Sequence, residues 1–438
     1  MPSTQTPDHH GSHRDLLCEA DDSSLDPRGI DAIIVPTARR PAYLDQAAAL
    51  ALALRCTLVT LHSKHWTRAA KAAQRVSRAV DLIAIDVPDA ASLRLPNWET
   101  SRLLAGTVFA SQADLSAKRN LGVVLSRMLG WSRVLFLDDD ITELNPDDVR
   151  RASGLLDTHN AIGLQVGGFP DHSVVCHAYL QAGGSQQSFV GGGALVVHLE
   201  RSDSFFPDIY NDDWFFLLDG DKGIQSVGIT GKVRQYPYDP FRTPDRARTE
   251  ELGDVLAEGI YWLLDQGRSL TDADRAHWTR FLHKRRQFIR RVLRMVEHDG
   301  TIGPADKAHR VAALKGSLGR LALITPDLCE KYLRAWMGDR LQWHRHLQKS
   351  FIRAVQQLPA NERRQQALAS LSRPGAPRLT WRSGGQCSRP AAFSIDAAPP
   401  IGFSAPSPAS VAALLRSPAP GYAQTAPAVR VGVARSAR

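Results

Sequence analysis

The chain has 438 residues, of which 43% are hydrophobic and 23% are charged, and its formal net charge is +9. A chain of this length and composition forms one large or two ordinary globular domains with substantial cores, which excludes fibrous and low-complexity proteins. The 5 cysteines are scattered and form no C-x-x-C pair, which argues against a disulfide framework or a zinc site and predicts a reducing, cytoplasmic environment.

The two ends of the chain differ from its middle. Residues 1–27 are polar and acidic, without the basic start and apolar core of a signal peptide, and we expect them to be disordered. Residues 371–438 are basic and rich in Pro, Ala and Ser, and we expect a disordered tail there. Positive charge is concentrated in this tail and in residues 280–294, so it gives little support for a nucleic-acid partner. No run of about 18 apolar residues is present, which predicts no membrane span.

Strand and helix patterns alternate between residues 28 and 265. Strands are expected at 32–35, 57–61, 81–85, 134–137, 161–166, 194–198 and 226–230, and helices at 41–54, 67–80 and 117–129. Strands separated by helices of about 10–15 residues predict a mostly parallel sheet flanked by helices. Residues 266–370 contain only helical patterns, at 271–299, 304–323 and 326–357, so we expect an all-helical extension after the α/β domain.

Three consecutive aspartates, residues 138–140, directly follow an apolar strand. Neighbouring carboxylates repel one another unless a cation lies between them, and hard oxygen ligands suit Mg²⁺ or Mn²⁺. The carboxyl ends of strands are also where open α/β sheets bind ligands. We therefore expect Asp138 and Asp140 to hold a divalent cation beside a substrate phosphate. The alternative is an acidic loop before the next helix, with Thr142 or Asn145 as its N-cap.

Polar residues follow the earlier strands at the same edge of the sheet, namely Thr37, Ser63 and Asp86. Each has an alternative explanation as turn chemistry, but together they predict a crevice that binds a nucleotide. Lys118 and Arg119 open the helix that leads into the aspartate strand. Cations and backbone N–H groups at a helix N-terminus suit a diphosphate, and the alternative is a solvated first turn.

Two later segments complete the candidate site. Residues 191–193 are three successive glycines before a strand, and glycine allows a backbone to approach a substrate closely. Asp212 and Asp213 lie where a helix is expected to begin, beside Trp214. A carboxylate against an aromatic surface can have its pKa raised toward the range of a general base. The alternative is N-capping of this helix by Asn211 or Asp212.

Two charge patterns lie outside this site. Glu250, Asp254 and Glu258 share one helix face with i, i+4 spacing, and the sequence leaves open whether they pair with the arginines just before them. Residues 280–296 predict a helix with one apolar stripe and many cations. Such a helix can lie on an anionic membrane surface, and the alternative is an ordinary bundle helix that packs its stripe on its neighbours.

In this order, the segments between about residues 30 and 262 resemble the GT-A type nucleotide-sugar glycosyltransferases, particularly family 2-like enzymes. The matching residues are Val35-Pro36-Thr37 with Arg40, Lys118-Arg119-Asn120 with Gly122, Asp138-Asp139-Asp140, Gly191-Gly192-Gly193 and Asp212-Asp213. The resemblance implies a Rossmann-like GT-A domain. It also implies a hexosyltransferase-type enzyme that uses Mn²⁺ or Mg²⁺ and moves a sugar from a nucleoside-diphosphate-sugar donor to an acceptor hydroxyl.

The resemblance further implies a role for each matching residue. Asp138 and Asp140 would hold the metal, and Asp213, with Asp212 as the alternative, would be the catalytic base. The donor would contact Pro36, Thr37, Arg40, Ser63, Asp86, Lys118, Arg119, Asn120, Asp139, Gly191, Gly192 and Gly193. The segment His62-Ser63 departs from the acidic segment that is common in the family, which leaves the nucleotide base open. The chain lacks a Q-x-x-R-W motif, so a processive polysaccharide synthase is not expected.

Other functions remain open at this stage. Residues 138–142 also fit the D-x-D-x-T motif of haloacid-dehalogenase-like phosphatases, although that motif normally lies on the first strand of its domain. A nucleotidylyltransferase on a similar sheet and a non-catalytic nucleotide-sugar-binding module are further alternatives. The sugar, the acceptor and the stereochemistry of transfer do not follow from the sequence.

Overall fold

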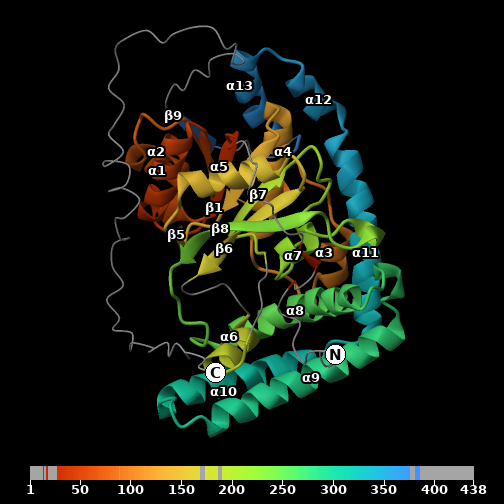
Figure 1. Ribbon diagram of the computed structural model, residues 1–438. Helices are drawn as coiled ribbons and strands as arrows, with labels where there is room; N and C mark the ends of the chain where they lie inside the picture. Colours follow the sequence, from red (N-terminus) through yellow and green to blue (C-terminus); the bar gives the residue numbers. More distant parts are fainter. Residues whose placement is uncertain are drawn as a thin grey trace, which may run out of the picture.

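The computed structural model describes residues 13, 16–17, 27–87, 89–167, 173–185, 190–374 and 380–384. These residues form an α/β fold around a nine-stranded sheet with the strand order β5-β8-β6-β7-β4-β1-β2-β3-β9 (Figure 1). The strands are β1 (Ala32–Thr37), β2 (Thr57–His62), β3 (Leu82–Asp86), β4 (Arg133–Leu137), β5 (Ile141–Thr142), β6 (Ala161–Gly167), β7 (Ala194–His198), β8 (Val227–Gln235) and β9 (Thr380–Gly384).

The centre of the sheet is parallel and buried on both faces. β3, β2, β1 and β4 run parallel to one another, whereas β7 is antiparallel to both β4 and β6. Every residue of β1 is buried, and successive side chains point to opposite faces. Ile34 packs into one core, while Ile33 and Val35 pack into the other. Burial on both faces explains why these strands are continuous apolar runs rather than alternating ones.

The helices cover both faces of the sheet. On one face, α1, α2 and α5 pack against the core that contains Ile33, and α4 packs on the opposite face. The helices are α1 (Asp45–Leu54), α2 (Ala69–Arg75), α3 (Glu99–Leu104), α4 (Leu115–Leu129), α5 (Pro146–Leu155), α6 (Val174–Gln181), α7 (Asp212–Phe216), α8 (Pro244–Asp265), α9 (Arg275–His298), α10 (Pro304–Leu321), α11 (Pro326–Leu347), α12 (Ser350–Gln356) and α13 (Ala360–Ser370).

The helices after residue 265 share a hydrophobic core with the sheet. α9 and α10 lie with α8 in a layer below the sheet, and α11 returns along its side toward α12 and α13 (Figure 1). Trp343 of α11 lies 5.8 Å from Trp98, measured between ring centroids, and Trp98 stacks on Phe205 at 4.3 Å. Asp339 of α11 also accepts hydrogen bonds from the first backbone N–H groups of α3. The apolar stripe of α9 is turned inward, with Phe281, Phe288 and Val292 buried.

The seven expected strands all form, and β8 extends to Gln235. Asn145, rather than Thr142, caps α5 by accepting a hydrogen bond from Asp147 N. α2 ends at Arg75, and the expected helix at 326–357 is divided between α11 and α12. β5 and β9 were not expected, because strands of two and five residues in polar surroundings have little periodicity.

Parts of the two segments expected to be disordered are ordered. His13 is fully buried, and its ring packs on Trp214 with 4.3 Å between the ring centroids. Residues 380–384 form β9, which pairs antiparallel with β3. The remainder of residues 1–27 and 371–438 lies almost entirely outside the described residues. Across the described part of the chain, no helix is both long and apolar enough to span a membrane.

Candidate active site

The aspartate cluster, Asp138–Asp140, lies where β4 ends beside the end of β1. The chain continues from β1 to β2 toward one edge of the sheet and from β4 to β5 and β6 toward the other edge, and a point where the strand order reverses in this way is where open sheets form a ligand crevice. Thr37, the last residue of β1, donates a 2.5 Å hydrogen bond from its hydroxyl to Asp139 Oδ2. Arg39 forms ion pairs with both Asp139 and Asp140, the latter at 3.0 Å. The expected meeting of strand ends at this edge is therefore present.

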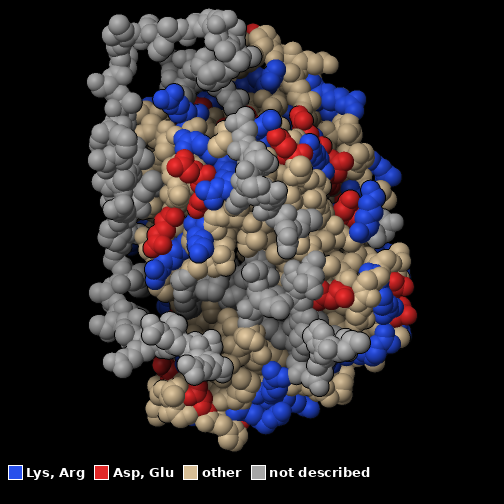
Figure 2. Space-filling model, viewed as in Figure 1, with Lys and Arg blue, Asp and Glu red and all other residues tan. Residues whose placement is uncertain are grey.

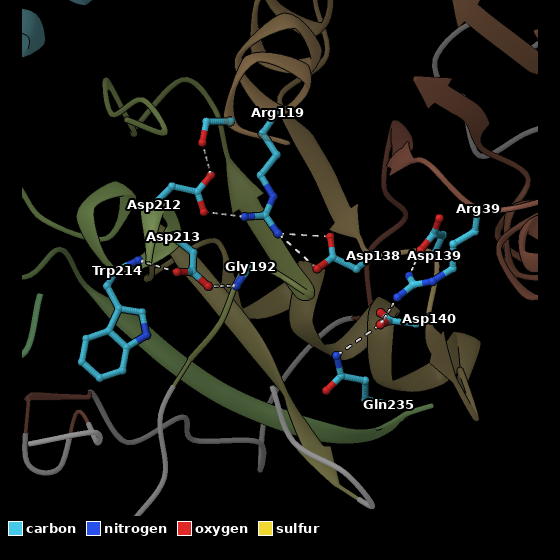
Figure 3. Close-up of polar contacts among 11 residues, drawn as sticks. Arg39, Arg119, Asp138, Asp139, Asp140, Gly192, Asp212, Asp213, Trp214 and Gln235 are labelled. Atoms are coloured by element: carbon cyan, nitrogen blue, oxygen red, sulfur yellow. Dashed lines mark hydrogen bonds and ion pairs between the residues drawn. The ribbon is translucent and has the colours of Figure 1, made fainter. Parts of the chain in front are cut away.

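Arg119 lies on the opposite side of the aspartate cluster (Figure 3). Its side chain, from α4, is only 3% exposed. Nη2 lies 3.1 Å from Asp138 Oδ1, and Nη1 lies 2.7 Å from Asp212 Oδ1. Burial opposes the charge on Arg119, but the attraction of Asp212 and Asp138 outweighs it and raises the pKa of the guanidinium. Arg119 thus joins the aspartate cluster to the acidic segment at 212–213.

The acidic pair, Asp212 and Asp213, begins α7, and its two members have different surroundings. Asp212 is buried and also accepts a 2.9 Å hydrogen bond from Ser116 Oγ. Burial raises its pKa to about 6, although Arg119 opposes the shift. Asp213 is half-buried and accepts hydrogen bonds from two backbone N–H groups, at Gly192 (2.5 Å) and at Trp214 (2.9 Å). These two bonds orient the Asp213 carboxylate.

The glycine segment, residues 191–193, needs its small residues for close packing. A Cβ at Gly192 would lie 2.8 Å from the Cζ atom of Arg119, which no side chain permits. Gly193 O accepts a 2.8 Å hydrogen bond from Asp138 N, so the segment is attached to the aspartate cluster. The backbone at Gly192 therefore lies close to the Arg119 guanidinium, and the expected close approach of this segment to a substrate stays a prediction.

A cavity of about 430 Å³ opens where these segments meet. Its wall contains Asp138 and Arg119 from the sheet side and both members of the acidic pair from α7. Other residues complete the wall, including Val108–Ala113, Ser116, Gly191, Gly193, Tyr210, Gln235 and Glu250. A volume of this size suits a small-molecule substrate rather than a macromolecule.

Lys118 and Ser63 lie beside the aspartate cluster but use their polar groups within the protein. Lys118 is buried, and Nζ contacts Thr37 O (3.0 Å), Ser63 Oγ (2.7 Å) and Asp114 Oδ1 (2.9 Å). An ammonium group has three donors, so these acceptors occupy all of them. Burial lowers the pKa of Lys118, although Asp114 opposes the shift.

Of the twelve predicted donor residues, only Arg119, Gly191 and Gly193 line the cavity in the described structure. Pro36 is buried within β1, and Asn120 exchanges hydrogen bonds with the backbone of Phe206. Asp86 caps α2 by accepting from Ala69 N at 2.7 Å. Arg40 is exposed and lies in a separate depression lined also by Lys71 and Arg75.

Three residues of the site were not predicted from the sequence: Arg39, Ser116 and Gln235. Arg39 was passed over in favour of its neighbour Arg40. Thr37 and Arg39 are two residues apart at a strand end, so both side chains reach the same face of the sheet. This spacing could have indicated Arg39 from the sequence. Ser116 directly precedes the helix expected at 117–129, but α4 begins at Leu115 and the Ser116 hydroxyl donates a hydrogen bond to Asp212.

The oxygen atoms around the aspartate cluster suit a hard divalent cation. The Asp138 side chain is 21% exposed at the cavity wall, and Asp140 lies within 3.3 Å of the Gln235 amide nitrogen. Gln235 Oε1 is buried and has no hydrogen-bond partner among the described residues. Among the described residues, no three His, Cys, Asp or Glu side chains are grouped so that they could hold a metal ion by themselves. A cation here would therefore complete its coordination shell with water and substrate phosphates, as Mg²⁺ commonly does.

No protein-family model matches this chain, and no curated protein is significantly similar to it in sequence. The function is therefore inferred from the geometry and chemistry of the site itself.

Proposed function

We propose that the protein is a GT-A type glycosyltransferase that moves a hexosyl group from a nucleoside-diphosphate-sugar to an acceptor hydroxyl. One observation carries the proposal: a single cavity of about 430 Å³ is lined by Asp138 of the aspartate cluster, by Gly191 and Gly193 of the glycine segment, and by the acidic pair. These are three of the five segments that carry the resemblance. Asp140 and Gly191 are 51 positions apart in the sequence, and the glycine segment meets the acidic pair through the contact of Gly192 N with Asp213.

The sheet supports the same interpretation. The parallel strands β3-β2-β1-β4 form a Rossmann-like half, and the switch point between β1 and β4 lies at the aspartate cluster. The mixed half, β7-β6-β8, brings the glycine segment and the end of β8 to that point. A nucleotide bound over the parallel half would thus present its diphosphate to Asp138 and its sugar to the cavity.

The acidic pair supplies a carboxylate for proton transfer. Both acids line the cavity, but Asp213 is half-buried and held by two backbone N–H groups, whereas Asp212 is buried and paired with Arg119. Asp213 would accept the proton of the acceptor hydroxyl as that oxygen attacks the sugar. Asp212 would keep Arg119 in place between the two acidic segments. General-base catalysis of this kind contributes about 10²–10⁴-fold to a rate.

Asp138 and Asp140, with Gln235 Oε1 beside them, would hold the Mn²⁺ or Mg²⁺ ion. When bound, such an ion stabilises negative charge on the departing nucleoside diphosphate. Arg39 and Arg119 lie on either side of the aspartate cluster and form ion pairs with its carboxylates, which hold these side chains in position (Figure 3). The hydrogen bond from the Thr37 hydroxyl holds Asp139 in place, and with it the turn that carries both proposed metal ligands.

The test is incubation of the protein with a panel of nucleotide-sugars and Mn²⁺, with release of nucleoside diphosphate as the readout. We expect slow hydrolysis of one donor and a rise in melting temperature with that donor, because a ligand that binds the folded state stabilises it. Asp147→Asn, an exposed acid on α5, is the matched control for substitutions in the site. Release of inorganic phosphate from simple esters, with no donor bound, would refute the proposal in favour of a phosphatase.

A further inference from the structure

α8 lies between α7, which carries the acidic pair, and α9 of the helical region (Figure 1). The chain that leads into α7 rests directly on α8. A Cβ at Gly253 would lie 2.1 Å from the carbonyl oxygen of Tyr210, so only glycine allows this approach. The position of Tyr210 relative to α8 is therefore set by backbone contact.

Asn211 begins α7 in a backbone conformation that few residues adopt. Its φ of 61° and ψ of 34° are left-handed, a region in which Asn is tolerated better than other residues with a side chain. Its carbonyl oxygen accepts from Trp214 N (3.1 Å) and Phe215 N (3.3 Å), which starts the helix. Its side-chain amide donates a 3.0 Å hydrogen bond to Asp254 Oδ1 on α8. The residue before the acidic pair is thus attached to α8.

Asp254 is itself fixed from α9. Arg285 is 1% exposed, and its Nη2 lies 2.6 Å from Asp254 Oδ2. The same guanidinium binds Glu251 (3.0 Å) and Glu258 (2.8 Å), forming a buried ion cluster of Arg285, Glu251, Asp254 and Glu258. Ser317 of α10 also donates its hydroxyl hydrogen to Glu251. The cluster therefore joins three long helices, and Asp254 contacts the segment before α7 through its bond to Asn211.

The cluster places one cation among three acids. The Arg285 guanidinium contacts Glu251, Asp254 and Glu258, and burial raises the pKa of Glu258 to about 8 against the opposing effect of Arg285.

We propose that Asp254, fixed by Arg285, is a positioning residue for the sugar-transfer site. It holds Asn211 and so sets the direction in which α7 presents Asp212 and Asp213 to the cavity. The inference rests on the proposed function and extends it, because the helical region beyond residue 265 then takes part in catalysis through α9.

Two substitutions separate positioning from simple stability. Asn211→Gly removes the side-chain bond to Asp254 while keeping a residue that favours the left-handed backbone. Ser317→Ala removes a hydrogen bond to the same buried ion cluster, but at a point that does not touch the acidic pair. Each variant loses one bond to the cluster, so both are expected to lower the melting temperature.

Of these two variants, only Asn211→Gly is expected to lower kcat. The expected loss is about ten- to a hundred-fold, because a small misplacement of a catalytic group has effects of that order. The KM for the donor should stay within about twofold, since the aspartate cluster is not displaced. Asn211→Asp provides a second variant, which keeps the shape of the residue and places a carboxylate against Asp254. It should show at least the same loss of kcat. Wild-type kcat in both Asn211 variants, or an equal loss in Ser317→Ala, overturns the inference.

Hydrogen exchange gives a readout that does not need turnover. The amides of Trp214 and Phe215, which bond to Asn211 O, should exchange faster in Asn211→Gly than in Ser317→Ala. Absence of turnover in the wild type with every donor would overturn the proposed function. Equal exchange in the two variants, with an active wild type, would overturn only the role of Asp254.

Discussion

Replacement of Arg119 by methionine tests the charge balance of the site most directly. The guanidinium is buried between Asp138 and Asp212, and the methionine keeps much of its volume without its charge. With Arg119 present, the pKa of Asp212 is about 6, so this carboxyl is about nine-tenths ionised at pH 7. An opposite charge at this distance lowers a carboxyl pKa by about 1–3 units, so its removal should raise the pKa of Asp212 to between roughly 7 and 9.

The consequence for stability has a defined sign. The pKa of Asp212 in the folded state is higher than its unfolded value of 3.8, so the folded state keeps this proton to a higher pH. The free energy of unfolding therefore falls as pH rises between these two pKa values. In the wild type this fall ends near pH 6, whereas in Arg119→Met it continues to about pH 7–9. The free energy of unfolding of the variant should therefore lose a further 1.4–4 kcal/mol, approximately, relative to the wild type above pH 6.

Urea unfolding of both proteins from pH 5 to pH 9 measures this difference. Glu258, with a pKa of about 8, titrates in the same range in both proteins, so its contribution cancels in the comparison. Arg127→Met on the same helix is the control, because its partner Asp203 is half exposed and their ion pair is screened by solvent. A difference between wild type and Arg119→Met that stays constant across this pH range would refute the reasoning.

Three further predictions concern the proposed reaction. Asp213→Asn should lower turnover by about 10²–10⁴-fold with little change in donor affinity, and an equal loss of donor affinity would reassign the residue to donor binding. Asp138→Ala and Asp140→Ala should abolish turnover while retaining the fold by circular dichroism, and full wild-type activity in excess EDTA would contradict a metal role. A basic cavity of about 410 Å³ over α9 is lined by Lys284, Arg290, Arg291 and Arg294. Figure 2 shows a group of Lys and Arg side chains near the base of the molecule, where α9 lies. We expect the protein to co-sediment with anionic vesicles at low salt and to be released at high salt, and no binding at low salt would leave α9 as a bundle helix only.

The strands of the parallel half were predictable because each is a short apolar run next to a helical pattern. β1 illustrates the point, since burial on both faces requires every residue from Ala32 to Val35 to be apolar. β5 and β9 were not predictable, because they are short and their apolar content is low. Their pairing depends on β8 and β3, which lie far away in the sequence.

The site was predictable as a set of segments but not as a set of contacts. Lys118 and Arg119 were both assigned to a diphosphate, yet Arg119 binds two carboxylates and Lys118 has three acceptors within the protein. Sequence spacing carries no information on these choices, because Arg119 and Asp212 are 93 residues apart and meet only through packing. The role of a buried cation is set by the carboxylates that surround it.

The acidic row on α8 gives a second example. The sequence left open whether its carboxylates pair with the arginines that precede them. Arg246 does pair with Glu250, whereas Asp254 and Glu258 bind Arg285, which follows them by about 30 residues. The acids of a long helix can pair with cations on any helix that packs against it. The arrangement of the helices therefore determines which ion pairs form.

The pairing of β9 with β3 protects the sheet from self-association. β9 occupies the full length of β3, from Leu82 opposite Gly384 to Asp86 opposite Thr380, and so it satisfies the outer N–H and C=O groups of that strand. A protein cut after Leu371 would present β3 as a bare, apolar edge. Exposed edges of this kind recruit strands from other molecules, so such a shortened protein would be prone to aggregate even with its active site intact.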